Sequence, residues 1–266
     1  MSKININTLR NRKKNNKPVV WVTAYDYPQA RIVDQAGVDM ILVGDSAGNT
    51  THGFTSTIPV TMEMMVLHAA AVARGAKSAF MIGDMPYMSY QISNEQAIEN
   101  AGRFIRCGMD AVKLEGDMPE RMKAITDAGI LGVGHLGLTP QSLAKMGGYK
   151  VQGKTSKQGE VILEQALRLE DNGMDLLLLE AMPPEPAAII TERLSIPVYG
   201  IGAGDKVDGQ LVILHDLLGL SFDFKCKFVK RYVDGELILT DAITQYAADV
   251  RTKQFPTEEH FYKGVE

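Results

Sequence analysis

Five polar residues close five apolar runs of the sequence, and four of the five are acidic. The runs have strand length and are apolar on both faces, which is typical of parallel strands covered by helices. The residues that end them are Asp45, Asp84, Glu115, His135 and Glu180. A single acidic strand end can be a helix N-cap, and Asp45 before Ser46 leaves that alternative open. Four carboxylates at one edge would repel one another unless cations held them, so the pattern favours a site.

A lysine lies within the same set of strand ends. The run DAVKLEG (110–116) places Lys113 and Glu115 two residues apart, and residues i and i+2 share a face of a strand. Burying either charge alone is costly. An internal ion pair or a half-exposed edge strand would explain this stretch taken alone. The acidic ends of the other runs instead favour a site that both side chains face.

These residue types suggest a particular chemistry. Carboxylates converging from neighbouring strands suit Mg²⁺, whereas Zn²⁺ is disfavoured because no two His or Cys residues have ligand spacing. Lys113 could hold a substrate carboxylate, and Glu180, on a strand further round, could act as a base without ligating the metal. His135 is either a further site residue or a structural hydrogen-bonding group. A metal, a cation and a free carboxylate base together suggest enolate formation from a 2-oxo acid.

The elements that must position these residues alternate along the chain. We expect the glycine ahead of each run in the left-handed conformation that ends a helix. These glycines are Gly37, Gly75, Gly108, Gly129 and Gly173. Helix starts are indicated at Thr61, at Ser93 with Gln96, at Asp117 before Pro119, at Thr139 before Pro140, and at Thr155 with Gln158. With further strands over 18–24, 196–204 and 210–215, the pattern predicts an α/β fold of the (β/α)8 TIM-barrel class.

Length and composition fit such a barrel. We expect residues 1–266 to form a single barrel domain, with 1–17 an N-terminal extension and about 240–266 a C-terminal helix and tail. The net charge of −4 and the pI near 5.8 disfavour a nucleic-acid partner. We expect a soluble, cytoplasmic protein without a membrane partner, because the two cysteines fit a reducing compartment and no apolar run resembles a signal peptide or a membrane span.

Three basic or glycine-rich segments have alternative interpretations. We interpret the basic run 10–17 as a solvated segment rather than a phosphate patch. The segment GIGAGDKVDG (200–209) lacks the GxxxxGK(S/T) order of a phosphate loop, so we favour a tight turn at the barrel rim. Because 204–209 is too short for a full helix, we expect the barrel to be irregular there. The loop MGGYKVQGKT (146–155) is favoured as a lid over the barrel mouth.

Long motifs run through most of the chain in a fixed order, from about Lys17 to Pro256. They are VTAYDYPQARIVDQAGVD, ILVGDSAG, GDMPYMSY, AVKLEG, GHLGLTPQS, GGYKVQGKT, IPVYGIGAG, DGQLVILHDLLGL and KFVKRY. In these motifs the sequence resembles the ketopantoate (3-methyl-2-oxobutanoate) hydroxymethyltransferase family of pantothenate and coenzyme A biosynthesis. The resemblance implies a barrel related to the phosphoenolpyruvate mutase/isocitrate lyase type. It also implies a homo-oligomer, which in this family is often a decamer.

The resemblance further implies an activity and its cofactors. Members of the family transfer a hydroxymethyl group from 5,10-methylenetetrahydrofolate to 3-methyl-2-oxobutanoate, giving ketopantoate and tetrahydrofolate, and they use Mg²⁺. By motif, the metal-binding and substrate-binding aspartates fall on Asp45 and Asp84. The metal-associated glutamate, which binds directly or through water, falls on Glu115.

The remaining roles are carried over in the same way. Further substrate contacts fall on Ser46 and Lys113, and the catalytic base falls on Glu180. His135 stands where the family has an active-site histidine of less settled role. The chain departs from the family at 49–56 and at Cys226, where proline is expected. These departures bear on loop shape and on folate affinity.

Three other functions remain open from the sequence. A related barrel could be a metal-dependent C–C lyase, which would not need folate for turnover. A non-catalytic barrel would bind Mg²⁺ and substrate without exchanging the C3 proton. A class I aldolase would use Lys113 as a Schiff base, which borohydride would trap.

Overall fold

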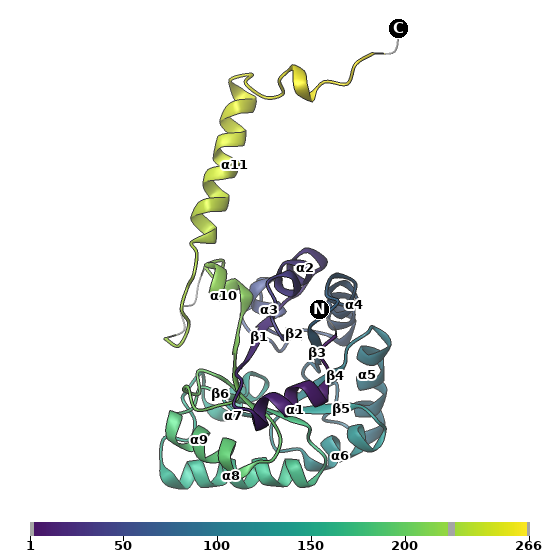
Figure 1. The fold of residues 1–266 in the computed structure, drawn as a ribbon, viewed down its shortest axis with the longest axis vertical. Helices are drawn as coiled ribbons and strands as arrows, with labels where there is room; N and C mark the ends of the chain where they lie inside the picture. Colours follow the sequence, from purple (N-terminus) through teal and green to yellow (C-terminus); the bar gives the residue numbers. More distant parts are fainter. Residues whose placement is uncertain (1–2, 223–226, 265–266) are drawn as a thin grey trace. The chain divides into compact units, whose positions relative to one another are not determined.

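The computed structural model describes residues 3–222 and 227–264, and within them eight parallel strands close into a barrel (Figure 1). The strands follow one another around the barrel in chain order, and the last pairs with the first. They are β1 (Val19–Thr23), β2 (Met40–Val43), β3 (Phe80–Asp84), β4 (Ala111–Glu115), β5 (Leu131–Gly137), β6 (Leu176–Glu180), β7 (Val198–Ile201) and β8 (Gly209–Val212). The predicted (β/α)8 barrel is confirmed.

Helices cover the outside of the barrel, and most begin where the sequence predicts. They are α2 (Tyr27–Gln35), α4 (Met62–Gly75), α5 (Asn94–Arg106), α6 (Pro119–Asp127), α8 (Ser156–Asp171) and α9 (Pro184–Arg193). The side chains of Thr61, Ser93 and Thr155 each accept a backbone N–H in the first turn of the helix that follows, which satisfies one otherwise unpaired donor. Thr155 and Gln158 complete the predicted capping box.

Two predictions about helix ends were wrong. Asp117 does not cap α6, which begins after Met118; its carboxylate pairs with Arg168 instead. Gly75 ends α4 without a left-handed conformation, unlike the other four glycines. A Cβ at Gly75 would lie 2.6 Å from the carbonyl oxygen of Tyr27, so this glycine allows α4 to pack closely on α2.

The connection between β7 and β8 confirms the predicted irregularity. Residues 202–208 contain no helix and return along the barrel from the end of one strand to the start of the next, as parallel pairing requires. This segment is therefore a crossover rather than the predicted tight turn. The last strand is shorter than expected, because the N–H of Leu214 bonds to the side chain of Thr23 and α10 (Leu214–Leu218) begins there.

Four aspartates, which we call the base aspartates, immediately precede the even-numbered strands. Each accepts the backbone N–H of a residue in a neighbouring odd-numbered strand, at 2.7–3.1 Å. The base aspartates are Asp39, Asp110, Asp175 and Asp208, and they bond to Val20, Met81, Gly132 and Val198 respectively. They therefore tie the strands together in pairs at the end of the barrel opposite the predicted site.

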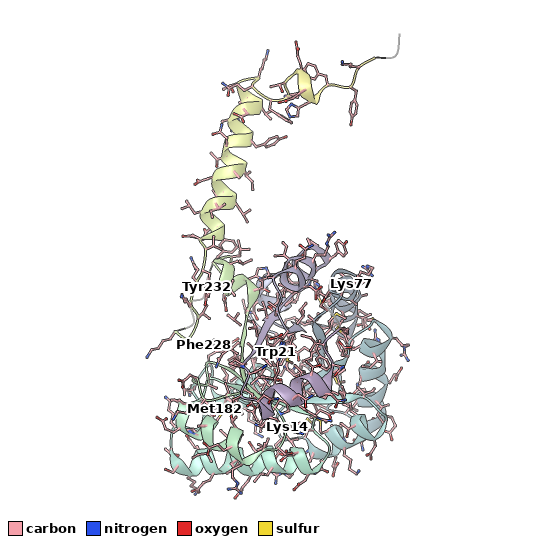
Figure 2. The ribbon with its side chains drawn as sticks, in the orientation of Figure 1. Lys14, Trp21, Lys77, Met182, Phe228 and Tyr232 are labelled. Carbon is pink, nitrogen blue, oxygen red and sulfur yellow. The ribbon has the colours of Figure 1, made fainter. Side chains whose placement is uncertain are left out.

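The N-terminal segment supplies one basic partner for each base aspartate. The partners of Asp39, Asp110, Asp175 and Asp208 are Arg12, Lys3, Arg10 and Lys13, at 2.7–2.8 Å. Between them, Leu9 of α1 (Ile6–Lys14) is fully buried in the same core cluster as Trp21, which is labelled in Figure 2. The prediction that the basic run is a solvated segment holds for most of its residues, which are exposed, but Arg12 and Lys13 are part-buried against the base of the barrel.

The chain divides into two compact units, Met1–Leu214 and His215–Glu266. The second contains α11 (Gly235–Arg251), which confirms a C-terminal helix that begins slightly earlier than expected, and no residue of this helix is buried. The organisation of 1–266 as one domain stays a prediction, and Cys226 lies outside the described residues. No helix in the described ranges is long and apolar enough to cross a membrane.

The base aspartates lead to a prediction about stability. Asp39→Ala should lower the free energy of unfolding by about 2–3 kcal/mol, because it removes the carboxylate that pairs with the guanidinium of Arg12 and accepts the N–H of Val20. Urea unfolding at pH 7 measures the change. The control is Asp127→Ala, whose pair with Lys123 is well exposed and should matter little. Equal losses in the two variants would contradict this role.

Candidate active site

The strand ends bring three of the predicted residues, Asp84, Glu115 and His135, around the buried ammonium group of Lys113. Lys113 Nζ lies 2.7 Å from Asp84 Oδ1 and 3.4 Å from Glu115 Oε1, and these three side chains are 2–3% exposed. Asp45 follows β2 by two residues, and its backbone N–H donates to Asp84 Oδ2 at 3.0 Å. Asp45 is not a helix N-cap, since Ser46 holds that position in α3 (Ala47–Thr50).

His135 connects this group to Glu180. Its Nδ1 lies 3.3 Å from Glu115 Oε1, and its Nε2 lies 3.1 Å from Glu180 Oε2. His135 lies within β5, which continues to Gly137, rather than at the predicted strand end. The Glu180 side chain is 17% exposed and that of His135 only 2%, so Glu180 faces the more open side. We call Asp45, Asp84, Lys113, Glu115, His135 and Glu180 the carboxylate cluster.

Ser46 lies beside the cluster, in hydrogen-bond contact with Tyr25. The two hydroxyl oxygens are 2.9 Å apart. The unusual segment 49–56 follows directly, and its His52 stacks on Phe54 and lies 2.9 Å from His68 of α4, measured between the two Nε2 atoms. The described contacts of His52 are therefore with its own loop and with α4. A substrate contact by Ser46 stays a prediction.

Burial and mutual repulsion set the charges of the cluster. Burial raises the pKa of Asp45, and the carboxylates of Asp84 and Glu115 raise it further. Burial also raises the pKa of Asp84, although Lys113 opposes the change. Burial alone would raise the pKa of Glu115, but the charges of Lys113 and His135 lower it to about 2. Asp84 has Lys113 against one of its oxygens, but the raised pKa of Asp45 shows that positive charge is lacking beside Asp45, which is where a cation would be stabilised.

The acidic neighbours of the two basic members of the cluster raise the pKa values of both. Burial would lower the pKa of Lys113, but Asp84, Glu115 and Asp45 hold it above its ordinary value. A Schiff base needs an unprotonated amine, so the aldolase alternative is disfavoured. Burial and Lys113 would lower the pKa of His135, whereas Glu115 and hydrogen bonds to both glutamates raise it to about 9.

The carboxylates beside Lys113 fit Mg²⁺ better than a metal ion that takes all its ligands from protein side chains. Within the described part of the chain, no three His, Cys, Asp or Glu side chains are grouped to hold a metal ion. Mg²⁺, however, is usually bound by one or two carboxylates and completes its shell with water and substrate oxygens. Asp45 and Asp84 form such a pair, joined by a hydrogen bond at 3.0 Å. Ligation by Asp45, Asp84 and Glu115 stays a prediction.

Two buried residues that the sequence analysis missed contact the cluster. The side-chain Nε2 of Gln141 donates to Asp45 Oδ2 at 2.9 Å, and its backbone N–H donates to Glu115 Oε2 at 3.0 Å. The hydroxyl of Tyr90 lies 2.8 Å from Gln141 Oε1. Tyr90 and Gln141 each stand six positions after a site residue, in GDMPYMSY and GHLGLTPQS. That spacing was the available signal, but nothing in it marks these side chains as buried.

The backbone beside Glu180 is closely fixed. Gly137 has φ 88°, and a Cβ there would lie 2.3 Å from the carbonyl oxygen of Glu180. Ala181 adopts a left-handed φ of 48°, which costs a residue with a Cβ about 1–2 kcal/mol. The N–H of Gln152 donates to the carbonyl oxygen of Ala181, so the segment 146–155 is tied beside Glu180. Its movement as a lid stays a prediction.

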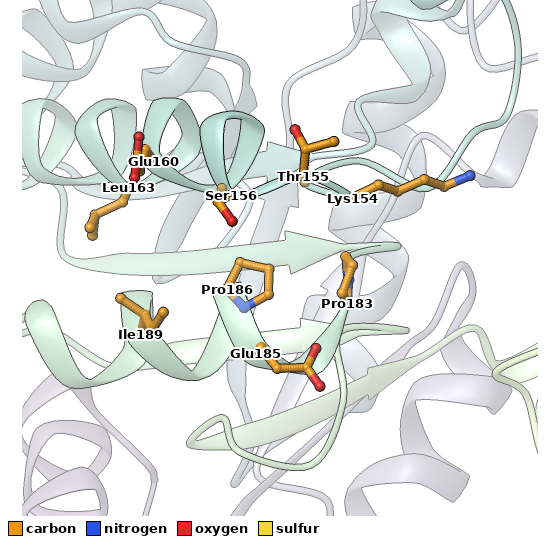
Figure 3. A pocket seen from close by; sticks show the side chains of 11 residues that line it. Lys154, Thr155, Ser156, Glu160, Leu163, Pro183, Glu185, Pro186 and Ile189 are labelled. Carbon is orange, nitrogen blue, oxygen red and sulfur yellow. The ribbon is translucent and has the colours of Figure 1, made fainter.

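A hollow of about 310 Å³ lies apart from the cluster, between the starts of α8 and α9 (Figure 3). Ser156 and Leu163 from α8 line it together with Pro186 and Ile189 from α9. No member of the carboxylate cluster contributes to its lining. The candidate active site therefore rests on the cluster and not on this hollow.

Comparison with known proteins identifies the family. A family model described as ketopantoate hydroxymethyltransferase matches residues 3–258. The chain belongs to the ketopantoate hydroxymethyltransferase family. A 3-methyl-2-oxobutanoate hydroxymethyltransferase of Thermoanaerobacter sp. (strain X514) is 51% identical over 263 residues, covering 98% of this chain and 96% of the relative. The protein of that name from Thermotoga maritima is 48% identical over 261 residues, covering 97% and 96%.

Solved structures with low identity share the fold. A phosphoenolpyruvate phosphomutase from Streptomyces platensis subsp. rosaceus has a TM-score of 0.66 at 17% identity, covering 98% of this chain and 92% of that one. A 2,3-dimethylmalate lyase, described as a member of the PEP mutase/isocitrate lyase superfamily, has a TM-score of 0.59 at 16% identity, covering 98% and 91%. The predicted relation of the ketopantoate hydroxymethyltransferase barrel to this superfamily is confirmed at the level of fold.

The shared ammonium group leads to a pH-dependent prediction. In the metal-free protein, Lys113→Met should lower the free energy of unfolding by about 3–5 kcal/mol at pH 8, because it removes the cation beside the buried carboxylate of Asp84 and leaves Glu115 with His135 alone. The folded-state pKa values of those carboxylates then lie above their unfolded values near 4. Their ionisation therefore opposes folding, and the loss grows as pH rises above about 4 and is smaller at pH 5.

Urea unfolding at pH 5 and pH 8 in the presence of a chelator measures this effect. The control is Lys123→Met, which removes an exposed lysine and should change little at either pH. A loss in Lys113→Met that is the same at both pH values would point to packing instead of charge.

Proposed function

We propose that the chain transfers a hydroxymethyl group from 5,10-methylenetetrahydrofolate to 3-methyl-2-oxobutanoate, giving ketopantoate and tetrahydrofolate in a Mg²⁺-dependent reaction. Membership of the ketopantoate hydroxymethyltransferase family and relatives at about 50% identity support this activity. The observation that carries it is the close approach of Asp45 and Asp84 at the carboxyl ends of neighbouring strands. In barrels of this class, catalytic groups gather at those ends.

Within the cluster, Asp45 and Asp84 are the proposed residues that hold the metal ion, and Glu180 is the proposed residue that takes a proton. When bound between Asp45 and Asp84, Mg²⁺ would polarise the keto group of the substrate and so acidify the C3–H bond. Glu180 is the proposed base, because its carboxylate faces the more open side of the cluster. Nε2 of His135 lies 3.1 Å from one oxygen of Glu180, so His135 is the proposed group that orients the carboxylate, and the other oxygen is left for the proton at C3.

The carbon–carbon bond then forms from the substrate enolate. C3 attacks the methylene carbon carried by folate, water supplies the oxygen of the new hydroxyl group, and tetrahydrofolate leaves. Ser46 and Lys113 are the proposed contacts of the substrate carboxylate. The Lys113 ammonium already pairs with Asp84 and Glu115. To bind Lys113, the substrate carboxylate must therefore replace one of these two carboxylates. On the resemblance alone, we also propose a homo-oligomer located in the cytoplasm.

Product analysis tests the activity directly. The purified protein should convert 3-methyl-2-oxobutanoate to ketopantoate only when both 5,10-methylenetetrahydrofolate and Mg²⁺ are supplied, because folate carries the transferred carbon and Mg²⁺ promotes enolisation. Mass spectrometry of the products measures this. Carbon–carbon cleavage without folate would favour the lyase alternative. Binding of Mg²⁺ and substrate with no C3 proton exchange would favour the non-catalytic one.

The base assignment has its own test. Glu180→Gln keeps the size and the hydrogen-bonding capacity of the side chain but cannot take the proton, so product formation should fall about 10²–10⁴-fold. Exchange of the C3 hydrogen in D₂O without folate, followed by NMR, should fall in parallel. The control is Glu185→Gln, at an exposed position of α9, which should retain both rates. Exchange that persists at the wild-type rate while turnover collapses would show that a group other than Glu180 takes the C3 proton.

A further inference from the structure

Gln141 joins two of the predicted metal carboxylates from outside their strands. It is buried in the short helix η1 (Pro140–Ser142) that follows β5. Its Nε2 donates to Asp45 Oδ2 and to the carbonyl oxygen of Met85, both at 2.9 Å. Its backbone N–H donates to Glu115 Oε2 at 3.0 Å. One neutral residue therefore restrains the rotation of carboxylates that come from two separate strands.

The orientation of the Gln141 amide is fixed by Tyr90. The Tyr90 hydroxyl accepts the backbone N–H of Glu115 at 3.0 Å, so its own proton is free to go to Gln141 Oε1, 2.8 Å away. The side chain of Gln91 donates to the same oxygen at 3.3 Å.

These contacts use the full hydrogen-bonding capacity of the amide. Its two N–H groups go to Asp45 and Met85, and its oxygen accepts from Tyr90 and Gln91. A rotated amide would place its oxygen against the Asp45 carboxylate and its N–H groups against two donors. Only one orientation is therefore favourable. In that orientation Gln141 holds Asp45 without neutralising it, whereas Lys113 places a positive charge against Asp84.

We propose that Gln141 is a positioning residue that sets the Mg²⁺ affinity of the carboxylate cluster, and that Tyr90 acts through it by orienting its amide. The inference rests on the proposed function, because it takes Asp45 and Glu115 as metal-associated residues. Groups that orient ligating side chains typically change metal affinity about 10–100-fold when they are removed. Neither Gln141 nor Tyr90 is assigned a contact with the reacting atoms.

Calorimetric titration of the metal-free wild-type and variant proteins with Mg²⁺ alone tests the proposal. Gln141→Met keeps the length of the side chain but removes the donors, and should weaken Mg²⁺ binding about 10–100-fold. Tyr90→Phe removes only the hydroxyl and should weaken it about 2–10-fold. Because both act through one amide, the double variant should bind no more weakly than Gln141→Met. Gln96→Met, in nearby α5, is the matched control and should leave the Kd unchanged.

Two further measurements separate positioning from a merely structural role. Product formation by Gln141→Met should recover toward the wild-type rate at saturating Mg²⁺, because the reacting groups are intact. A structural role would instead lower the thermal unfolding temperature in chelator while leaving the Mg²⁺ Kd of the folded protein unchanged, and that result would overturn the proposal. Should Gln141→Met fail to fold, Tyr90→Phe decides, since an unchanged Kd there also overturns it.

The outcomes also separate this proposal from the proposed function. Unchanged Kd values in the variants, with Mg²⁺-dependent product formation by the wild-type protein, would refute the positioning role and leave the function standing. A wild-type protein that neither binds Mg²⁺ nor forms product would refute both.

Discussion

One ammonium group, that of Lys113, makes the carboxylate cluster possible. Removing carboxylates from water without a cation is costly, and here three of them approach one another inside the barrel. Lys113 lies 2.7 Å from Asp84 and 3.4 Å from Glu115, but its single charge does not balance them all. The pKa of Asp45 stays raised by burial and by its acidic neighbours. The fold therefore holds the cluster together but leaves part of its negative charge unbalanced, and a divalent cation would balance it.

The two ends of the barrel use the same residue type to opposite effect. Each base aspartate has its own basic partner from the N-terminal segment and accepts a backbone N–H, so each carboxylate has both a cation and a hydrogen-bond donor. At the other end, the carboxylates share Lys113 and His135. Compensated carboxylates stabilise a barrel, and undercompensated ones can bind a cation and take a proton. This difference matches the division between the stabilising and catalytic faces of (β/α)8 barrels.

The sequence predicts most of the fold, because the order of a glycine, an apolar run and a polar residue recurs five times along the chain. It also predicts the cluster, since five of its six members end such a run and Lys113 shares a strand face with Glu115. It does not predict the pairing of the basic N-terminal run, because Arg12 and Lys13 find partners 27 and 195 residues away. Tyr90 and Gln141 were missed for a related reason: uncharged side chains in loops carry no pattern that reveals burial. Such contacts depend on tertiary packing, which local periodicity does not encode.

The segment after β5 contacts the cluster near its start and the backbone next to Glu180 near its end. Near its start, Gln141 holds Asp45 and Glu115; near its end, Gln152 bonds to the left-handed Ala181 beside Glu180. The metal-binding side and the proposed base therefore share one connecting segment, although their strands lie apart in the barrel. A displacement of that segment would disturb the carboxylate hydrogen bonds and the backbone at Glu180 together. We therefore expect the segment and the site to become ordered together, and a disordered segment to leave the site disordered as well.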